Sequence, residues 1–128
     1  MTSYKPPDHN AVSPFLLVHS VDAMLAFLRA TFDAAEVYKM TLPDGSVKHA
    51  EVRIDDSIVM MGERPAGDAA IQCSTHVYVP DVDGAYERAL AAGATSIVAP
   101  RDQPYGDRSC GVRDPQGNTW WIGTRLPK

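Results

Sequence analysis

The chain has 128 residues, of which 45% are hydrophobic and 22% charged, with a formal net charge of −4 and a pI of about 5.4. This length and composition predict a single globular domain, residues 1–128, and exclude a disordered or fibrous protein. Lys and Arg are scattered and form no basic stripe, so we expect no nucleic-acid partner.

Targeting signals and cysteine spacing indicate the compartment. The longest apolar stretch near the start, residues 15–18, is far too short to cross a membrane, and the polar, Pro-rich leader at residues 1–12 has no signal-peptide core. Cys73 and Cys110 show neither CxxC nor metal-site spacing, which favours free thiols. We therefore expect a cytoplasmic protein with no membrane partner.

The first half of the chain predicts one helix and four strands. A short apolar strand at residues 14–18 precedes a helix at residues 21–32, whose apolar side chains recur every three or four positions and so share one face. Residues 37–41, 47–54 and 57–61 predict three more strands, separated by turn residues.

The second half repeats this order of elements. Residues 76–79 predict a strand, residues 82–92 a helix that ends at Gly93, and residues 95–98, 109–113 and 119–123 three strands. The pattern is βαβββ twice, with a first module at 13–61, a linker at 62–75 and a second module at 76–124. A four-stranded module exposes two edges and one face, so the modules are expected to pair.

The final hairpin is the most specific local feature. In Asp114-Pro-Gln-Gly-Asn118, proline presets φ, Gly117 accepts a positive φ, and the Asp and Asn side chains can bond the local backbone. The segment 105–123 resembles the closing hairpin of the vicinal oxygen chelate superfamily, which includes glyoxalase I, extradiol dioxygenases, fosfomycin-modifying enzymes and bleomycin-resistance proteins. The resemblance extends from about Pro14 onward.

This resemblance implies a fold and an assembly. The expected fold is α+β, with two βαβββ modules forming a curved mixed sheet around a cleft and the helices outside. Members are commonly homodimers, and the paired modules come from one chain or from two.

The resemblance also implies four metal-ligand positions, one on the first and last strand of each module, mostly His or Glu in the family's enzymes. Here they fall near Ser13, near Met60, on His76 and on Trp121. A single imidazole cannot hold a divalent ion against water, so we expect no metal and no cofactor, and we assign no catalytic residue. His76 could instead be a residual ligand, a general base, a partner of a bound molecule, or a strand-end imidazole satisfied by the backbone.

What remains at these positions is aromatic and apolar, which predicts a small-molecule site. Trp121 would stack on a planar ligand, Tyr78 would add a polar tip, Met60 would adapt its shape, and Phe15 would either line the cleft or fill it. A Gly-containing loop with Tyr105 and Arg108 could close over the ligand. The predicted ligand-binding residues are Phe15, Met60, His76, Tyr78, Tyr105, Arg108 and Trp121.

Two polar groups have open interpretations. Alternation places His49, Glu51 and Arg53 on one face of a strand. If this face lines the cleft, they could bind a ligand or act as acid and base; if it faces solvent, they form an ion pair of little energetic value, and this second interpretation is favoured. Arg108 would either hold an anionic group or pair with a neighbouring Asp. We assign no role to the histidine of the leader, His9.

These observations favour a metal-free protein that binds a drug or planar metabolite and acts by sequestration, like bleomycin-resistance proteins. The first alternative is a metal-dependent isomerase, lyase or dioxygenase of the same superfamily, with ligands other than those placed above. The second is a structural subunit whose cleft is filled by its own side chains.

Overall fold

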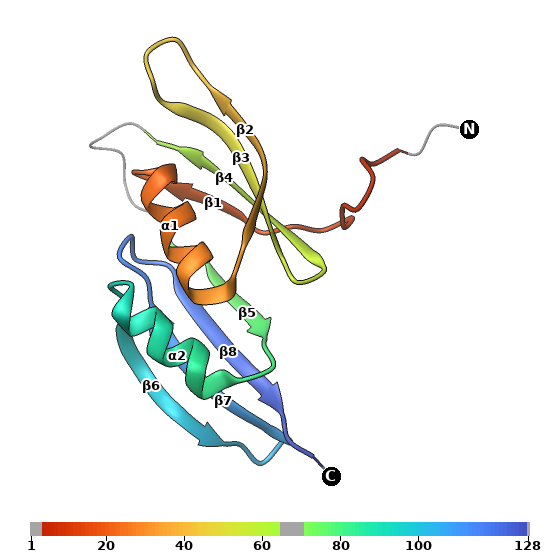
Figure 1. Cartoon of the computed structure of the whole chain (residues 1–128), viewed down its shortest axis with the longest axis vertical. Coiled ribbons are helices and arrows are strands. Elements are labelled where there is room, and N and C mark those ends of the chain that lie inside the picture. Colours follow the sequence, from red (N-terminus) through yellow and green to blue (C-terminus); the bar gives the residue numbers. More distant parts are fainter. Residues whose placement is uncertain (1–3, 65–70, 128) are drawn as a thin grey trace.

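The computed structural model describes residues 4–64 and 71–127, in which two helices and eight strands follow the predicted order (Figure 1). The first module contains β1 (Phe15–Val18), α1 (Val21–Phe32), β2 (Ala35–Thr41), β3 (Val47–Ile54) and β4 (Ser57–Glu63). The second contains β5 (Ser74–Tyr78), α2 (Val82–Ala91), β6 (Thr95–Asp102), β7 (Asp107–Arg113) and β8 (Thr119–Arg125). The predicted α+β class and the repeated βαβββ order are confirmed.

Each module forms its own mixed sheet. The strand orders are β1-β4-β3-β2 and β5-β8-β7-β6. In each, the first and last strands of the module pair in parallel, while the other neighbours are antiparallel. The curved sheet implied by the resemblance is thus divided into two hydrogen-bonded sheets. The modules meet where α1 contacts α2 and where the Cys73 thiol, just before β5, donates to the Phe15 carbonyl at 3.6 Å.

Both helices begin at side-chain caps. Ser20 accepts a hydrogen bond from the backbone N–H of Ala23, and Asp81 accepts one from Gly84, which satisfies donors that a helix N-terminus leaves free. Gly93, where the second helix was predicted to end, follows α2 and has a positive φ of 104°. The apolar face predicted for α1 is buried as a set: Val21, Met24, Leu25, Leu28 and Phe32.

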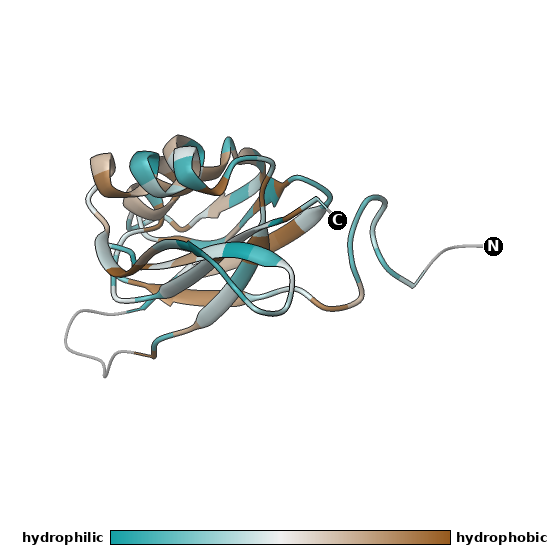
Figure 2. Ribbon diagram, turned by 90° about the horizontal axis from the view of Figure 1, so that it is seen from below, coloured by the Kyte–Doolittle hydropathy of each residue, from teal (hydrophilic) through white to brown (hydrophobic). Residues whose placement is uncertain are grey.

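The two helices cover the same side of both sheets, as Figure 2 shows from below. One continuous core links the modules, and the Phe32 ring lies 5.4 Å from the buried Trp120 ring. The Gln116 side chain adds a polar clamp, because it accepts from the backbone N–H groups of His19 and Ser20 and donates to the Ser20 carbonyl. In the described part of the chain no helix lies on the opposite faces of the sheets, and we call these the inner faces.

The final turn is built around a buried carboxylate. Asp114 is 4% exposed, and one of its oxygens accepts from the backbone N–H groups of Gln116 and Asn118. Its other oxygen accepts from the indole N–H of Trp120, which is fully buried. The predicted hairpin is confirmed, and its turn is tied to the core by this bond.

Several strands are longer than predicted. β4 runs to Glu63 and β5 begins at Ser74, so both enter the expected linker at 62–75, of which residues 65–70 lie outside the described part. Glu63 is held there because its carboxylate accepts from the backbone N–H groups of Val21 and Val47. No helix in residues 4–64 and 71–127 is long and apolar enough to span a membrane.

Candidate ligand-binding site

The predicted site positions occupy equivalent places in the two modules. Phe15 of β1 lies opposite Met60 of β4, and His76 of β5 lies opposite Trp121 of β8. Their chain neighbours point to the helix-side core, so these four side chains lie on the inner faces. The register makes Phe15 the equivalent of His76 and corrects the placement near Ser13, which precedes β1.

The inner face of the second module carries an ordered group of rings. The rings of His76 and Tyr78 meet edge to face with centroids 4.5 Å apart. The Trp121 indole donates to the Ser74 hydroxyl at 2.9 Å, and the Tyr78 hydroxyl donates to the Asp107 carboxylate at 2.8 Å. Tyr78 and Trp121 are nevertheless 59% and 38% exposed. The hydrogen bonds hold the polar edges of the Tyr78 and Trp121 rings in place, and part of each side chain remains exposed to solvent.

The bond to Asp107 also changes the acidity of the Tyr78 phenol. Donation to the carboxylate, together with desolvation, raises the pKa of Tyr78 above its ordinary value. The phenol therefore stays protonated at neutral pH. Its oxygen keeps lone pairs with which it can accept a hydrogen bond from a bound molecule.

Glycines lie directly beneath the rings. A Cβ on Gly111 would lie 2.4 Å from Cζ3 of Trp121, and one on Gly123 would lie 3.3 Å from Nε2 of His76. In the first module, a Cβ on Gly62 would lie 3.6 Å from Cζ of Phe15. At Gly111 the absence of a side chain lets the Trp121 ring lie against the strand backbone, whereas at Gly62 the closest contact of a Cβ would be the Lys48 carbonyl oxygen at 2.8 Å. Isolated glycines in strands are the sequence signal that could have indicated this.

The inner face of the first module is more polar than the sequence predicts. Glu51 lies in the same row as Met60 and Phe15, and its side chain is only 13% exposed. Its two carboxylate oxygens contact Nε2 of His49 at 2.8 Å and Nε2 of His9 at 2.5 Å. The solvent-facing interpretation of this stripe is therefore wrong for Glu51, and His9, which was assigned no role, contacts its carboxylate. No local pattern reveals a contact across 42 positions.

Two opposing effects act on this carboxylate. Burial alone would raise the pKa of Glu51, but the hydrogen bonds from His9 and His49 outweigh it and lower that pKa below the ordinary value. Glu51 is thus ionised at neutral pH. The Phe15 ring lies 5.7 Å from the His49 ring, so this charged group borders the apolar part of the site.

The structure separates the two predicted loop residues. Tyr105 is 70% exposed, and its hydroxyl lies 3.4 Å from that of Ser109, next to the second-module rings. Arg108 belongs to β7 and points to the helix side, where its Nε donates to Asp83 of α2 and its Nη1 to Asp102. Arg108 therefore does not line the ring-lined face. The direction of its side chain follows from alternation along β7, whereas the sequence predicted a loop at this position.

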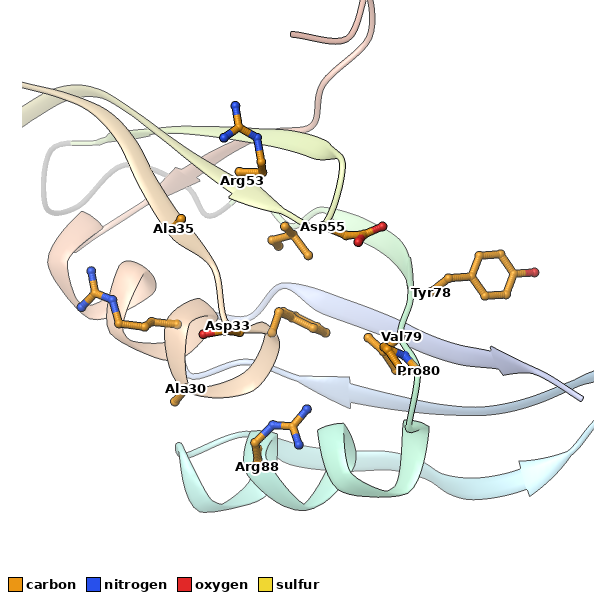
Figure 3. Close-up of a pocket in the computed structure, with 12 residues that line it drawn as sticks. Ala30, Asp33, Ala35, Arg53, Asp55, Tyr78, Val79, Pro80 and Arg88 are labelled. Atoms are coloured by element: carbon orange, nitrogen blue, oxygen red, sulfur yellow. The ribbon is translucent and has the colours of Figure 1, made fainter. Parts of the chain in front are cut away.

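Three hollows border these residues. One of about 630 Å³ is lined by Phe15, Leu17, His49 and Gly62 on the first inner face, and one of about 320 Å³ lies between the modules beside Pro14, Ile58, His76 and Tyr78. A third, of about 890 Å³, lies between the end of α1, the turn after β3, the segment before α2, and Arg88 in the last turn of α2 (Figure 3). There Arg88 points into the space and donates to the Thr31 carbonyl, whereas the Tyr78 ring points away.

A match to a family model shows the superfamily of this chain. The model of the glyoxalase/bleomycin resistance protein/dioxygenase superfamily matches residues 8–122. The chain belongs to this superfamily. The uncharacterized protein Mb0911c of Mycobacterium bovis is 36% identical over 124 residues, covering 88% of this chain and 82% of that protein. Rv0887c of Mycobacterium tuberculosis is also 36% identical, with 73% of its length covered.

Solved structures of other proteins share this fold. TioX from Micromonospora sp. ML1 is 25% identical with a TM-score of 0.73, over 91% of this chain and 100% of that chain. The fosfomycin resistance protein FosX from Mesorhizobium loti is 19% identical with a TM-score of 0.66, over 90% and 91% of the two chains. The second likeness concerns the fold alone.

The donor set of this superfamily member does not fit a divalent cation. The positions to which the resemblance assigns the metal ligands, with Phe15 taken in place of Ser13, are Phe15, Met60, His76 and Trp121, and together they offer one imidazole and one thioether. Within residues 4–64 and 71–127, no group of three or more His, Cys, Asp or Glu side chains is arranged to hold a metal ion. We therefore derive no metal-dependent step from this site.

Proposed function

We propose that this superfamily member binds a planar, partly apolar small molecule on its inner faces and acts by sequestration. The observation that carries the proposal is the Trp121 ring, which lies over Gly111, is oriented by Ser74 and remains 38% exposed. A ring held in this way is a stacking surface whose conformational freedom is already restricted. Binding by such a surface requires no reacting group.

The neighbouring side chains indicate the chemistry of the ligand. Aromatic stacking contributes about 0.5–1.5 kcal/mol beyond the burial of area. His76 and the Tyr78 oxygen can exchange hydrogen bonds with polar substituents at the edge of a ring, and Met60 can adapt to an irregular shape. A planar ligand with a few heteroatoms at its rim matches this arrangement.

We further propose that the functional unit is a cytoplasmic homodimer. A small-molecule pocket usually buries about 70–90% of its ligand, and an inner face that is open to solvent cannot do so alone. Phe15, Tyr38, Tyr78 and Trp121 are all exposed large side chains. In the described part of the chain, β1 and β5 each pair on one side only, which leaves edges where a module of a partner chain could close the site.

A second candidate is an enzyme of the same superfamily, an isomerase, lyase or dioxygenase. The observation that favours it is the ionised Glu51 between two imidazoles, in the row of Met60 and Phe15. Such a carboxylate could accept a proton from a substrate. One tightly held transition metal ion per chain, measured on protein purified without added metal, would favour this candidate over sequestration.

A ligand screen tests the main proposal. A planar aromatic compound that binds the native state should raise the melting temperature, and Trp121→Ala should remove that shift. Leu90→Ala is the matched control, because Leu90 is also 38% exposed but lies on α2, on the other side of the sheet. The control should keep the shift, and if the shift also survives unchanged in Trp121→Ala, the proposed location of the site is refuted.

A further inference from the structure

Two residues of the leader, His9 and Asn10, contact the first module. The side-chain oxygen of Asn10 accepts a hydrogen bond from the backbone N–H of Ile58 at 3.0 Å. Ile58 is fully buried, although it alternates with the core residue Val59 and lies outside the core cluster beneath the helices. Its burial on the inner face thus coincides with the place where the leader is bound.

His9 is the second point of attachment, and both nitrogens of its ring face oxygen acceptors. Nδ1 lies 2.9 Å from the Pro7 carbonyl oxygen, and Nε2 lies 2.5 Å from the Glu51 carboxylate. A carbonyl oxygen and an ionised carboxylate can only accept. Both ring nitrogens must therefore carry a proton, which makes His9 an imidazolium. A neutral ring would place one nitrogen lone pair against an oxygen lone pair.

We propose that residues 4–12 form a proton-controlled strap, held on the inner face by the doubly donating His9 and released when that ring loses a proton. Release would leave the backbone N–H of Ile58 without its acceptor and would free the Glu51 oxygen that faces His9, while His49 keeps the other oxygen. The inner face of the first module would therefore become more negative as the strap leaves.

The surrounding charges decide the pH range. On β3, Glu51 attracts the imidazolium, His49 donates to the other Glu51 oxygen, and Arg53 opposes the charge of His9. Asp8 of the strap and Asp56 of the turn after β3 line the same hollow as His9. The hydrogen bonds to Pro7 and then to Glu51 raise the pKa of His9 above its ordinary value of 6.5.

The direction of the pH effect follows from these two groups. Because the pKa of bound His9 is raised, its contribution to strap binding is complete below the ordinary pKa and is lost as pH rises through the raised one. Because the pKa of Glu51 is lowered, its contribution is complete above the ordinary carboxyl pKa and is lost only as pH falls through the lowered value. The strap is closed between these limits and opens on the alkaline side.

Amide hydrogen exchange of the full chain without any ligand tests the proposal. The Ile58 amide reports the bound strap, and its protection factor should fall as pH rises from below 6.5, the ordinary pKa of His9, through the raised pKa, with a limiting slope of about tenfold per pH unit. The ¹⁵N shifts of the His9 ring should change from imidazolium to neutral over the same range. His9→Gln, which cannot carry the charge, should make the protection factor low and independent of pH.

The control variant is His19→Gln, which alters an exposed histidine outside the strap and should keep the wild-type profile. Equal Ile58 protection at both ends of the range, a neutral His9 ring at about pH 6, or an unchanged profile in His9→Gln would each overturn the proposal. The measurement contains no ligand, so its outcome is independent of the sequestration function.

Discussion

Replacing Gly111 with alanine should displace the Trp121 ring while leaving the fold intact. The new methyl carbon would lie 2.4 Å from Cζ3 and 2.7 Å from Cε3 of the ring, whereas carbon atoms in contact are normally about 3.5–4.0 Å apart. The ring edge must therefore move by about 1 Å or more. Gly111 lies in the middle of β7, where alanine is otherwise the more favourable residue.

These contacts set limits on the change in the free energy of unfolding that Gly111→Ala causes. Keeping the ring in place would cost about 1–3 kcal/mol of overpacking, and moving it would lose the bond to Ser74, worth about 0.5–1.5 kcal/mol. Alanine returns about 0.5–1 kcal/mol of strand stability. Because moving the ring is the cheaper course, we expect a net loss of at most about 1 kcal/mol, which lowers the melting temperature by no more than about 6 °C in a chain of this size.

A double-mutant cycle with Trp121→Ala isolates the cause. Once the ring is absent, Gly111→Ala should be neutral or stabilise by about 0.5–1 kcal/mol, as measured by urea denaturation of all four proteins. Gly111→Ala should also weaken ligand binding in the otherwise wild-type protein. If its cost is the same with and without the Trp121 ring, the ring does not lie on Gly111 and the reasoning fails.

Two further predictions concern the helix-side core. Cys110 should be alkylated far more slowly than Cys73 at about pH 8, because burial raises the pKa of its thiol to about 11 and its side chain is 2% exposed; equal labelling by mass spectrometry would contradict this. Asp114→Ala should lower the free energy of unfolding by about 2–4 kcal/mol, since it leaves the Trp120 indole and two turn N–H groups without their acceptor; a loss below about 1 kcal/mol in urea denaturation would show that other acceptors replace it.

The order of elements could be predicted because its signals are local. The spacing of apolar residues in α1 gives its bounds without error, and the Asp114 turn carries its own hydrogen-bonding groups. Strand ends were less accurate, as in β4, because Glu63 is held there by backbone groups distant in sequence. The equivalence of the two modules likewise follows from the repeat in the sequence.

The sequence by itself determined which side chains share a face of each strand, since alternation is a property of the extended chain. Only the tertiary structure decided toward what each face points. In the folded chain Glu51 lies on an inner face, Arg108 pairs with Asp83 of α2, and His9 contacts a carboxylate 42 positions away. Such choices depend on packing between distant segments, and no periodicity along the chain records them.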